Sequence, residues 1–161
     1  MRTTCAIGAE AMKRTIRRSK ELSSEGQFLA SVEYESRMQG ASFLAYPPVV
    51  AAGQGMPCLT QTMLMFLGNN ANTIHYIAST SAVLPSEFVL MDAGCEYHGY
   101  ASDITRTWPA GGLFSDGQLS VYQAVLDTQQ RLIANIVPGV TTIDGLYKDM
   151  QVVAVDKALK C

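Results

Sequence analysis

The chain has 161 residues, of which 48% are apolar and 16% are charged, and its formal net charge is −2. This length can bury one hydrophobic core, and the composition is that of an ordinary globular protein. The small negative charge excludes the basic footprint of a nucleic-acid-binding protein, and no apolar run approaches the roughly 18 residues that a membrane span requires.

Hydrophobic periodicity and turn residues predict a chain that mixes helices and strands. The expected helices are 6–22, 27–39, 116–136 and one that starts at residue 141 or 142, and the expected strands are 42–46, 49–52, 72–77, 88–91 and 100–108. Ser115 is expected to cap the third helix. The first helix is basic with a single acid, Glu10, which fits either a surface helix or an organelle presequence.

Residues 55–69 differ from their surroundings, because they hold three of the eight methionines and no charged residue. The segment has no helical or strand period, and loops are seldom so apolar. We interpret it as an insertion, either an exposed loop or the translation of a short unspliced intron. Codons for Gly55-Met56 and for 66–68 accommodate intron boundaries of the GTATG and TCTAG type.

Residues 88–108 predict a β-hairpin that carries two aspartates. The first strand is a continuous apolar run, and the second is rich in Thr, Ile and aromatic residues. If Tyr97 and His98 form the two-residue loop, Asp92 lies directly opposite Asp103. Carboxylates in such a pair have Cβ atoms about 4.5–5.5 Å apart and repel each other. A divalent cation between them is then the simplest stabilisation, although each aspartate taken singly could be a surface residue.

Other polar residues allow two interpretations each. His75 is either a hydrogen-bonded core histidine or a site residue, and its apolar surroundings in the sequence favour the core role. His98 and Glu96 are expected to be solvated at the turn. Cys95 is expected to be a packed thiol, because no Lys or Arg lies near it in the sequence to make it a nucleophile. Arg106 either forms a structural ion pair or touches the site.

Several motifs together resemble the Xaa-Pro aminopeptidases (aminopeptidase P), especially the mitochondrial type. The motifs are NTIHY at 72–76, LMDAGCE at 90–96 and GYASDITRTWP at 99–109. The likeness covers nearly the whole chain apart from 55–69. Methionine aminopeptidases share the fold and the paired aspartates, but their second aspartate lies in a His-Gly-Asp-like context that is absent from this sequence.

The resemblance implies an α+β pita-bread fold, of which residues 1–161 are the first half only, an incomplete metallopeptidase catalytic domain. It implies two divalent metal ions, expected to be manganese, bound by two aspartates of the first half and by a histidine and two glutamates of the second. Asp92 matches one metal-binding aspartate and Asp103 matches the bridging one. His75 matches a histidine on the substrate-binding wall, which reverses the preference for a core role.

The sequence departs from the family pattern in one respect. No histidine follows His98 and no glutamate follows Glu96, so the three remaining ligands are missing from these residues. The family activity is the release of an N-terminal residue that precedes proline, and the 161-residue chain alone is expected to be inactive. The alternatives are a non-catalytic binding or regulatory fragment that pairs with a full-length subunit, and a prolidase-like dipeptidase.

The expected partners follow from the same resemblance. The substrate would be a peptide with proline at its second position, and a homodimer is one expected assembly. Nucleic acid and membranes are not expected partners. The resemblance suggests a mitochondrial or a cytoplasmic location.

Overall fold

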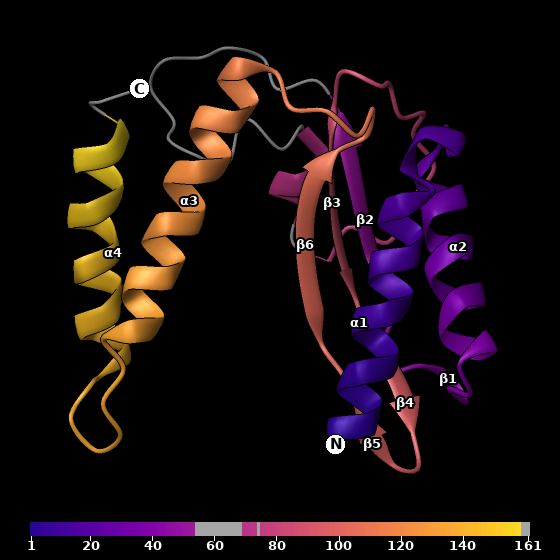
Figure 1. The fold of residues 1–161 in the computed structure, drawn as a ribbon, viewed down its shortest axis with the longest axis horizontal. Coiled ribbons are helices and arrows are strands. Elements are labelled where there is room, and N and C mark those ends of the chain that lie inside the picture. The colour runs from indigo at the N-terminus through magenta and orange to yellow at the C-terminus, as the bar shows by residue number, and fades with distance from the viewer. Residues whose placement is uncertain (54–68, 74, 159–161) are drawn as a thin grey trace. The chain divides into compact units, whose positions relative to one another are not determined.

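The structure is a computed structural model that describes residues 1–53, 69–73 and 75–158. The chain divides into two compact units, Met1–Leu113 and Phe114–Cys161. The first unit contains α1 (Arg2–Arg17), η1 (Ser19–Glu21), α2 (Glu25–Met38), β1 (Phe43–Leu44), β2 (Val49–Gly53), η3 (Asn69–Asn72), β3 (Phe88–Ala93), β4 (Cys95–Tyr97), β5 (Tyr100–Ala101) and β6 (Ile104–Pro109). The second unit contains α3 (Asp116–Ala134) and α4 (Ile143–Ala158), as Figure 1 shows.

The strands of the first unit form two small antiparallel sheets. One sheet has the order β2-β3-β6 and the other has the order β1-β4-β5. β3 and β4 follow each other along the chain, as do β5 and β6, so one long hairpin contributes two strands to each sheet. Its loop is the pair His98-Gly99, because Tyr97 is paired with Tyr100. Both loop residues have positive φ, at 53° and 80°, as a type I′ turn requires.

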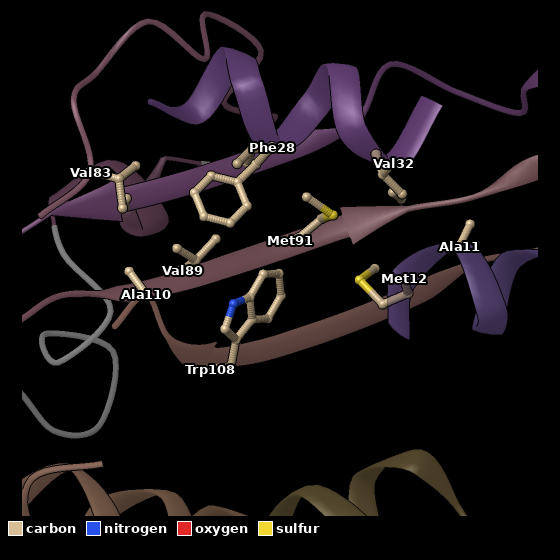
Figure 2. Close-up of a cluster of buried hydrophobic side chains, with 12 residues drawn as sticks. Ala11, Met12, Phe28, Val32, Val83, Val89, Met91, Trp108 and Ala110 are labelled. Atoms are coloured by element: carbon tan, nitrogen blue, oxygen red, sulfur yellow. The ribbon is translucent and has the colours of Figure 1, made fainter. Parts of the chain in front are cut away.

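The core of the first unit lies between its two helices and one face of the β2-β3-β6 sheet. Alternate residues of the central strand, Val89 and Met91, point into this core and are fully buried. Phe28 of α2 packs on Trp108 of β6 with ring centroids 6.0 Å apart, and Met12 of α1 completes the cluster (Figure 2). Burial of each such large apolar side chain contributes about 1.5–3 kcal/mol, so this cluster is the main source of stability in the first unit.

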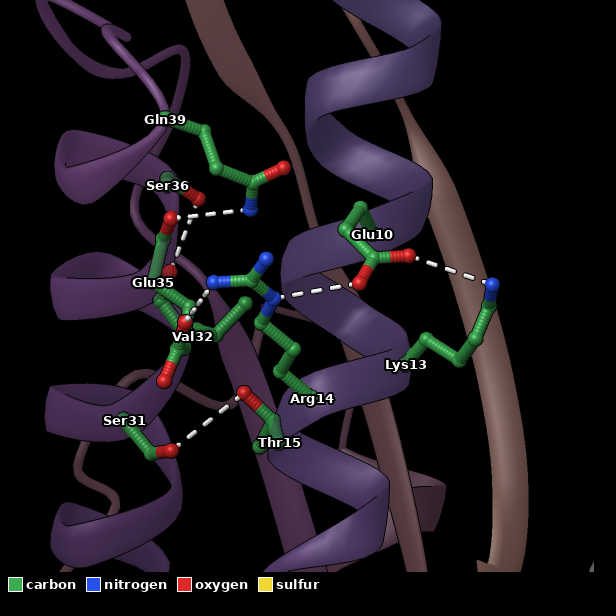
Figure 3. A network of polar contacts seen from close by, with 9 residues as sticks. All are labelled: Glu10, Lys13, Arg14, Thr15, Ser31, Val32, Glu35, Ser36 and Gln39. Carbon is green, nitrogen blue, oxygen red and sulfur yellow. Dashed lines mark hydrogen bonds and ion pairs between the residues drawn. The ribbon is translucent and has the colours of Figure 1, made fainter.

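Polar contacts within α1 and between α1 and α2 supplement the core. Arg14 binds Glu10 at 3.1 Å and Glu35 at 3.3 Å, and the Ser31 hydroxyl donates to that of Thr15 at 3.3 Å (Figure 3). The Arg14 side chain is 46% exposed, and ion pairs this open to solvent contribute about 0–1 kcal/mol. These contacts therefore orient the helices more than they stabilise them.

The predicted helices are confirmed with shifted ends, and the Ser115 cap is confirmed as part of a capping box with Gln118. The strand predicted at 72–77 is wrong: η3 ends at Asn72, and His75 lies in a turn with φ of 57°. Such a backbone cannot continue a strand. Of the predicted insertion, only residue 69 falls within the described residues. Among all the residues that the structure describes, no helix has the length and apolar character needed to cross a bilayer.

Candidate metal centre

The two aspartates of the hairpin converge on one tyrosine hydroxyl. Asp92 is the penultimate residue of β3, and Asp103 immediately precedes β6. Tyr46, in the loop between β1 and β2, places its hydroxyl oxygen 2.6 Å from Asp92 Oδ1 and 3.0 Å from Asp103 Oδ1. Both carboxylates therefore lie on the same side of the sheet, within reach of one oxygen atom.

The register of the hairpin differs from the predicted one. Asp92 is paired with Thr105, not with Asp103. The loop is one residue further along the chain than predicted, which changes the register by two residues. Because side chains alternate with a period of two, Asp103 stays on the face of Asp92 as its diagonal neighbour. Such neighbours are about 7–8 Å apart on the backbone, still close enough for side chains to converge.

The electrostatics of the pair centre on Tyr46. Its partial burial raises the pKa of the phenol above its usual value, and the adjacent carboxylates of Asp92 and Asp103 raise the pKa further. Tyr46 therefore remains a neutral donor at neutral pH. A hydroxyl carries a single proton, so two carboxylates share one donor. The remaining negative charge is of the kind that a bound cation neutralises.

The donor set fits a hard divalent cation in chemical type. Carboxylate oxygens are the ligands that Mg²⁺, Mn²⁺ and Ca²⁺ prefer. Asp92 is half-buried and Asp103 is exposed, so an ion could reach the pair from solvent. Within the described part of the chain, no group of three or more His, Cys, Asp or Glu residues is placed to hold a metal. The pair supplies two carboxylates, fewer than such a group contains.

A glycine makes the close approach of Tyr46 possible. A Cβ atom on Gly94 would collide with the carbonyl oxygen of Ser102 and lie 2.8 Å from Cε1 of the Tyr46 ring. Gly94 therefore lets the ring lie directly against the end of β3, beside Asp92. The sequence pattern does not mark Tyr46 as a site residue. The one feature of the sequence that bears on Tyr46 is that it precedes Pro47, because a residue before proline favours an extended backbone.

His75 lies in an exposed turn, not in a strand of the core. Among the described residues, no hydrogen bond or ion pair joins His75 to Asp92 or Asp103. The histidine that follows the hairpin strand, His98, is exposed in the loop and stacks on Tyr97 with ring centroids 4.2 Å apart. The expectation that His98 is solvated is therefore confirmed.

The remaining candidates have structural roles. Cys95 is fully buried, with its sulfur 3.5 Å from the hydroxyl of Ser102, so the packed thiol is confirmed. Glu96 is half-buried and accepts a hydrogen bond from the backbone N–H of Gly99 inside the turn. Arg106 is exposed and donates to the carbonyl oxygen of Thr105 at 2.7 Å.

The chain belongs to metallopeptidase family M24, whose family model matches residues 1–159. It is 38% identical over 141 residues to the mitochondrial intermediate cleaving peptidase 55 of Arabidopsis thaliana, covering 88% of this chain and 26% of that protein. It is 38% identical over 144 residues to Xaa-Pro aminopeptidase 3 of Homo sapiens, covering 89% and 25%.

Solved structures give the same result. An alanine variant of Escherichia coli aminopeptidase P matches with a TM-score of 0.80 and 26% identity over 98% of this chain and 32% of that one. Pseudomonas aeruginosa aminopeptidase PepP matches with a TM-score of 0.73 and 30% identity, over 98% and 33%. The α+β fold described above is therefore part of the pita-bread fold of aminopeptidase P, and the chain spans about a quarter of the length of these curated relatives.

The solved variants also provide spacings. In Escherichia coli aminopeptidase P, two of the residues replaced by alanine are aspartates eleven positions apart, and a third is a histidine seventeen positions before the first of them. In this chain Asp92 and Asp103 are eleven positions apart, and His75 is seventeen positions before Asp92.

Proposed function

We propose that residues 1–161 form part of the catalytic domain of a metal-dependent aminopeptidase that releases an N-terminal residue preceding proline. The observation that carries the proposal is the convergence of Asp92 and Asp103 on the Tyr46 hydroxyl, in a chain of family M24. The names of the relatives, Xaa-Pro aminopeptidase 3 among them, support the substrate class. In this domain, 55–69 is an insertion.

Each site residue has a proposed role. Asp92 and Asp103 would hold divalent metal, and the matching spacings in Escherichia coli aminopeptidase P support both assignments. When bound, the metal supplies Lewis-acid polarisation of the scissile carbonyl; we propose manganese for a two-metal centre of hard oxygen ligands. Tyr46 orients the two carboxylates through its hydrogen bonds. His75 would contact the peptide on the substrate-binding wall.

The ligand count limits what these residues do alone. Two carboxylates bind a divalent ion weakly, because hard divalent cations take about six or more oxygen ligands in total. The histidine and the two glutamates that the family adds are not among residues 99–161. We therefore propose that the 161-residue chain by itself does not cleave peptides, and that the complete site acts on peptides with proline second. We also propose that the protein forms a homodimer. We propose a mitochondrial location, which the name of the Arabidopsis relative supports.

Manganese titration tests the metal assignment. We expect weak binding, followed as loss of the electron paramagnetic resonance signal of free Mn²⁺, and we expect Asp92→Asn and Asp103→Asn each to abolish it. Asp149→Asn, which changes an exposed aspartate of α4, is the matched control and should bind as the parent chain does. Equal binding by all four proteins would remove the assignment.

A cleavage assay separates the alternatives. With manganese added, the purified chain is expected to release nothing from a short Xaa-Pro peptide, whereas measurable release would show that two carboxylates suffice. Co-purification with a full-length subunit would favour the regulatory fragment. Among complete enzymes, cleavage confined to dipeptides would favour the prolidase-like alternative.

A further inference from the structure

A second polar cluster, far from Asp92 in the sequence, is formed by the single carboxylate of Glu25 and four hydrogen-bond donors. This side chain, at the first position of α2, has no exposed surface at all. Its Oε1 accepts from the backbone N–H of Ala52 at 2.9 Å and from Nδ2 of Asn70 at 3.0 Å. Its Oε2 accepts from the Tyr76 hydroxyl at 2.8 Å and from the backbone N–H of Ser81 at 2.9 Å.

These four contacts suit an ionised carboxylate. Each partner donates and none is cationic, and an ionised carboxylate only accepts hydrogen bonds. The position in the first turn of α2 adds the positive end of the helix dipole. A buried charge with every oxygen satisfied is costly to disturb, because loss of a donor leaves the group desolvated without a partner.

Two of the four donors belong to the segment that carries His75. Tyr76 directly follows His75 in the chain, and its hydroxyl holds the segment to Glu25. Ser81 is held twice, because its carbonyl oxygen also accepts from the backbone N–H of Glu25 at 3.0 Å. Two residues further on, Val83 donates to the carbonyl oxygen of Ser23 at 2.9 Å. The segment is thus docked along the start of α2.

The backbone conformation of His75 is consistent with such a restraint. Its φ of 57° is in the left-handed region, where residues other than glycine are uncommon and are held by their surroundings. The ring of His75 is exposed, whereas the next residue, Tyr76, is half-buried. The inward hydrogen bond of Tyr76 therefore anchors the residue next to this histidine.

We propose that Glu25 is a positioning residue, whose buried carboxylate fixes Tyr76 and Ser81 and thereby sets the orientation of His75. This inference rests on the proposed function, in which His75 contacts the peptide. Glu25 touches neither substrate nor metal and acts only through the segment that it holds.

The two histidines of the chain make the proposal measurable, because the ring protons of His75 and His98 give two sets of NMR signals that single substitutions assign. We expect Glu25→Gln and Tyr76→Phe to displace or broaden the His75 signals while those of His98 stay in place. Glu33→Gln, on the outer side of α2 and paired with Arg37, should move neither.

A purely structural role gives a different result: a lower unfolding temperature, with unchanged His75 signals in the folded protein. That result for both variants would overturn the proposal. If Glu25→Gln fails to fold, Tyr76→Phe decides alone, since it removes one hydroxyl and keeps the carboxylate. Global unfolding of Tyr76→Phe would also overturn it, because the cluster would then hold the whole unit and not this segment.

A peptide titration keeps the two proposals apart. Added to the parent chain, a short Xaa-Pro peptide should perturb the His75 signals if this residue contacts substrate. No perturbation at millimolar peptide would count against the role of His75 in the proposed function. The effect of Glu25 on the orientation of His75 is judged without peptide and would stand.

Discussion

At the candidate metal centre, Tyr46 connects the carboxylates of two diagonal neighbours whose backbones are about 7–8 Å apart. Its hydroxyl is the one atom that contacts both Asp92 and Asp103 in the hydrogen bonds described. It therefore sets the distance between the two acids before any ion arrives. The absence of a side chain at Gly94 leaves room for the Tyr46 ring beside it.

Replacement of Tyr46 by Phe should lower the free energy of unfolding at neutral pH. Hydrogen bonds to charged groups contribute about 1.5–3 kcal/mol, and partial exposure of the site places the expected loss near the lower end. Urea titration followed by circular dichroism would measure it. A Tyr34→Phe variant, which removes an exposed hydroxyl on α2, should unfold like the parent.

The same tyrosine makes a pH dependence testable. Because the folded-state pKa of Tyr46 is raised above the usual 10.0 of a phenol, the folded protein prefers the protonated phenol. Its contribution to stability is fully present below pH 10 and is lost as the pH rises through the folded-state pKa. The parent chain should therefore lose more stability above pH 10 than Tyr46→Phe does. Parallel curves for the two proteins would contradict the raised pKa.

At the scale of single elements, the sequence predicted what depends on local pattern. The amphipathic helices and the Ser115 cap follow from periodicity and side-chain chemistry, and the shared face of Asp92 and Asp103 follows from the alternation along a hairpin. The exact register did not, because both Tyr97-His98 and His98-Gly99 are plausible turns. Only the pairing of Tyr97 with Tyr100 decides between them.

Long-range contacts account for the remaining errors. Residues 72–77 alternate like a strand, but Tyr76 is bound to a carboxylate 51 positions earlier in the chain, and no local pattern reveals that bond. The convergence of Tyr46 on two acids, 46 and 57 positions away, is equally invisible in the sequence. Resemblance to a family suggested the proposed roles of the aspartates but not this contact.

Residues on either side of the proposed insertion donate hydrogen bonds to the same oxygen atom. Ala52, near the end of β2, and Asn70, in η3, both donate to Oε1 of Glu25. Replacement of residues 55–69 by a short Ser-Gly linker should therefore preserve the fold. Closing a shorter loop costs less entropy, by about 0.6 kcal/mol for each halving of its length, so the unfolding temperature should stay equal or rise slightly. Calorimetry would measure it, and an unfolded product would show that 55–69 is integral to the domain.

At the scale of the whole molecule, the buried apolar clusters belong to the first unit. Their residues run from Ile7 to Ala110, whereas the side chains described as buried in α3 and α4 are only Ala124 and Thr128. Several large apolar side chains of the second unit are exposed, among them Ile133, Val140 and Ile143. The two units should therefore differ greatly in independent stability.

Separate expression of the units tests this difference. A fragment of residues 1–113 should unfold cooperatively in urea, because it keeps both clusters and both sheets. Residues 114–161 alone should have little helix by circular dichroism, since most helical stability in proteins comes from tertiary packing of an apolar face. Cooperative unfolding of the second fragment would contradict the assignment of the core to the first unit.

The single tryptophan of the chain is at the centre of that core. Trp108 packs against Phe28, is only 6% exposed and donates its indole N–H to the hydroxyl of Ser19 at 2.8 Å. Its fluorescence is therefore an intrinsic optical reporter whose emission should shift to the red when the first unit opens. The same emission gives no direct signal from α3 and α4, so an optical melting curve of the intact chain records the stability of residues 1–113.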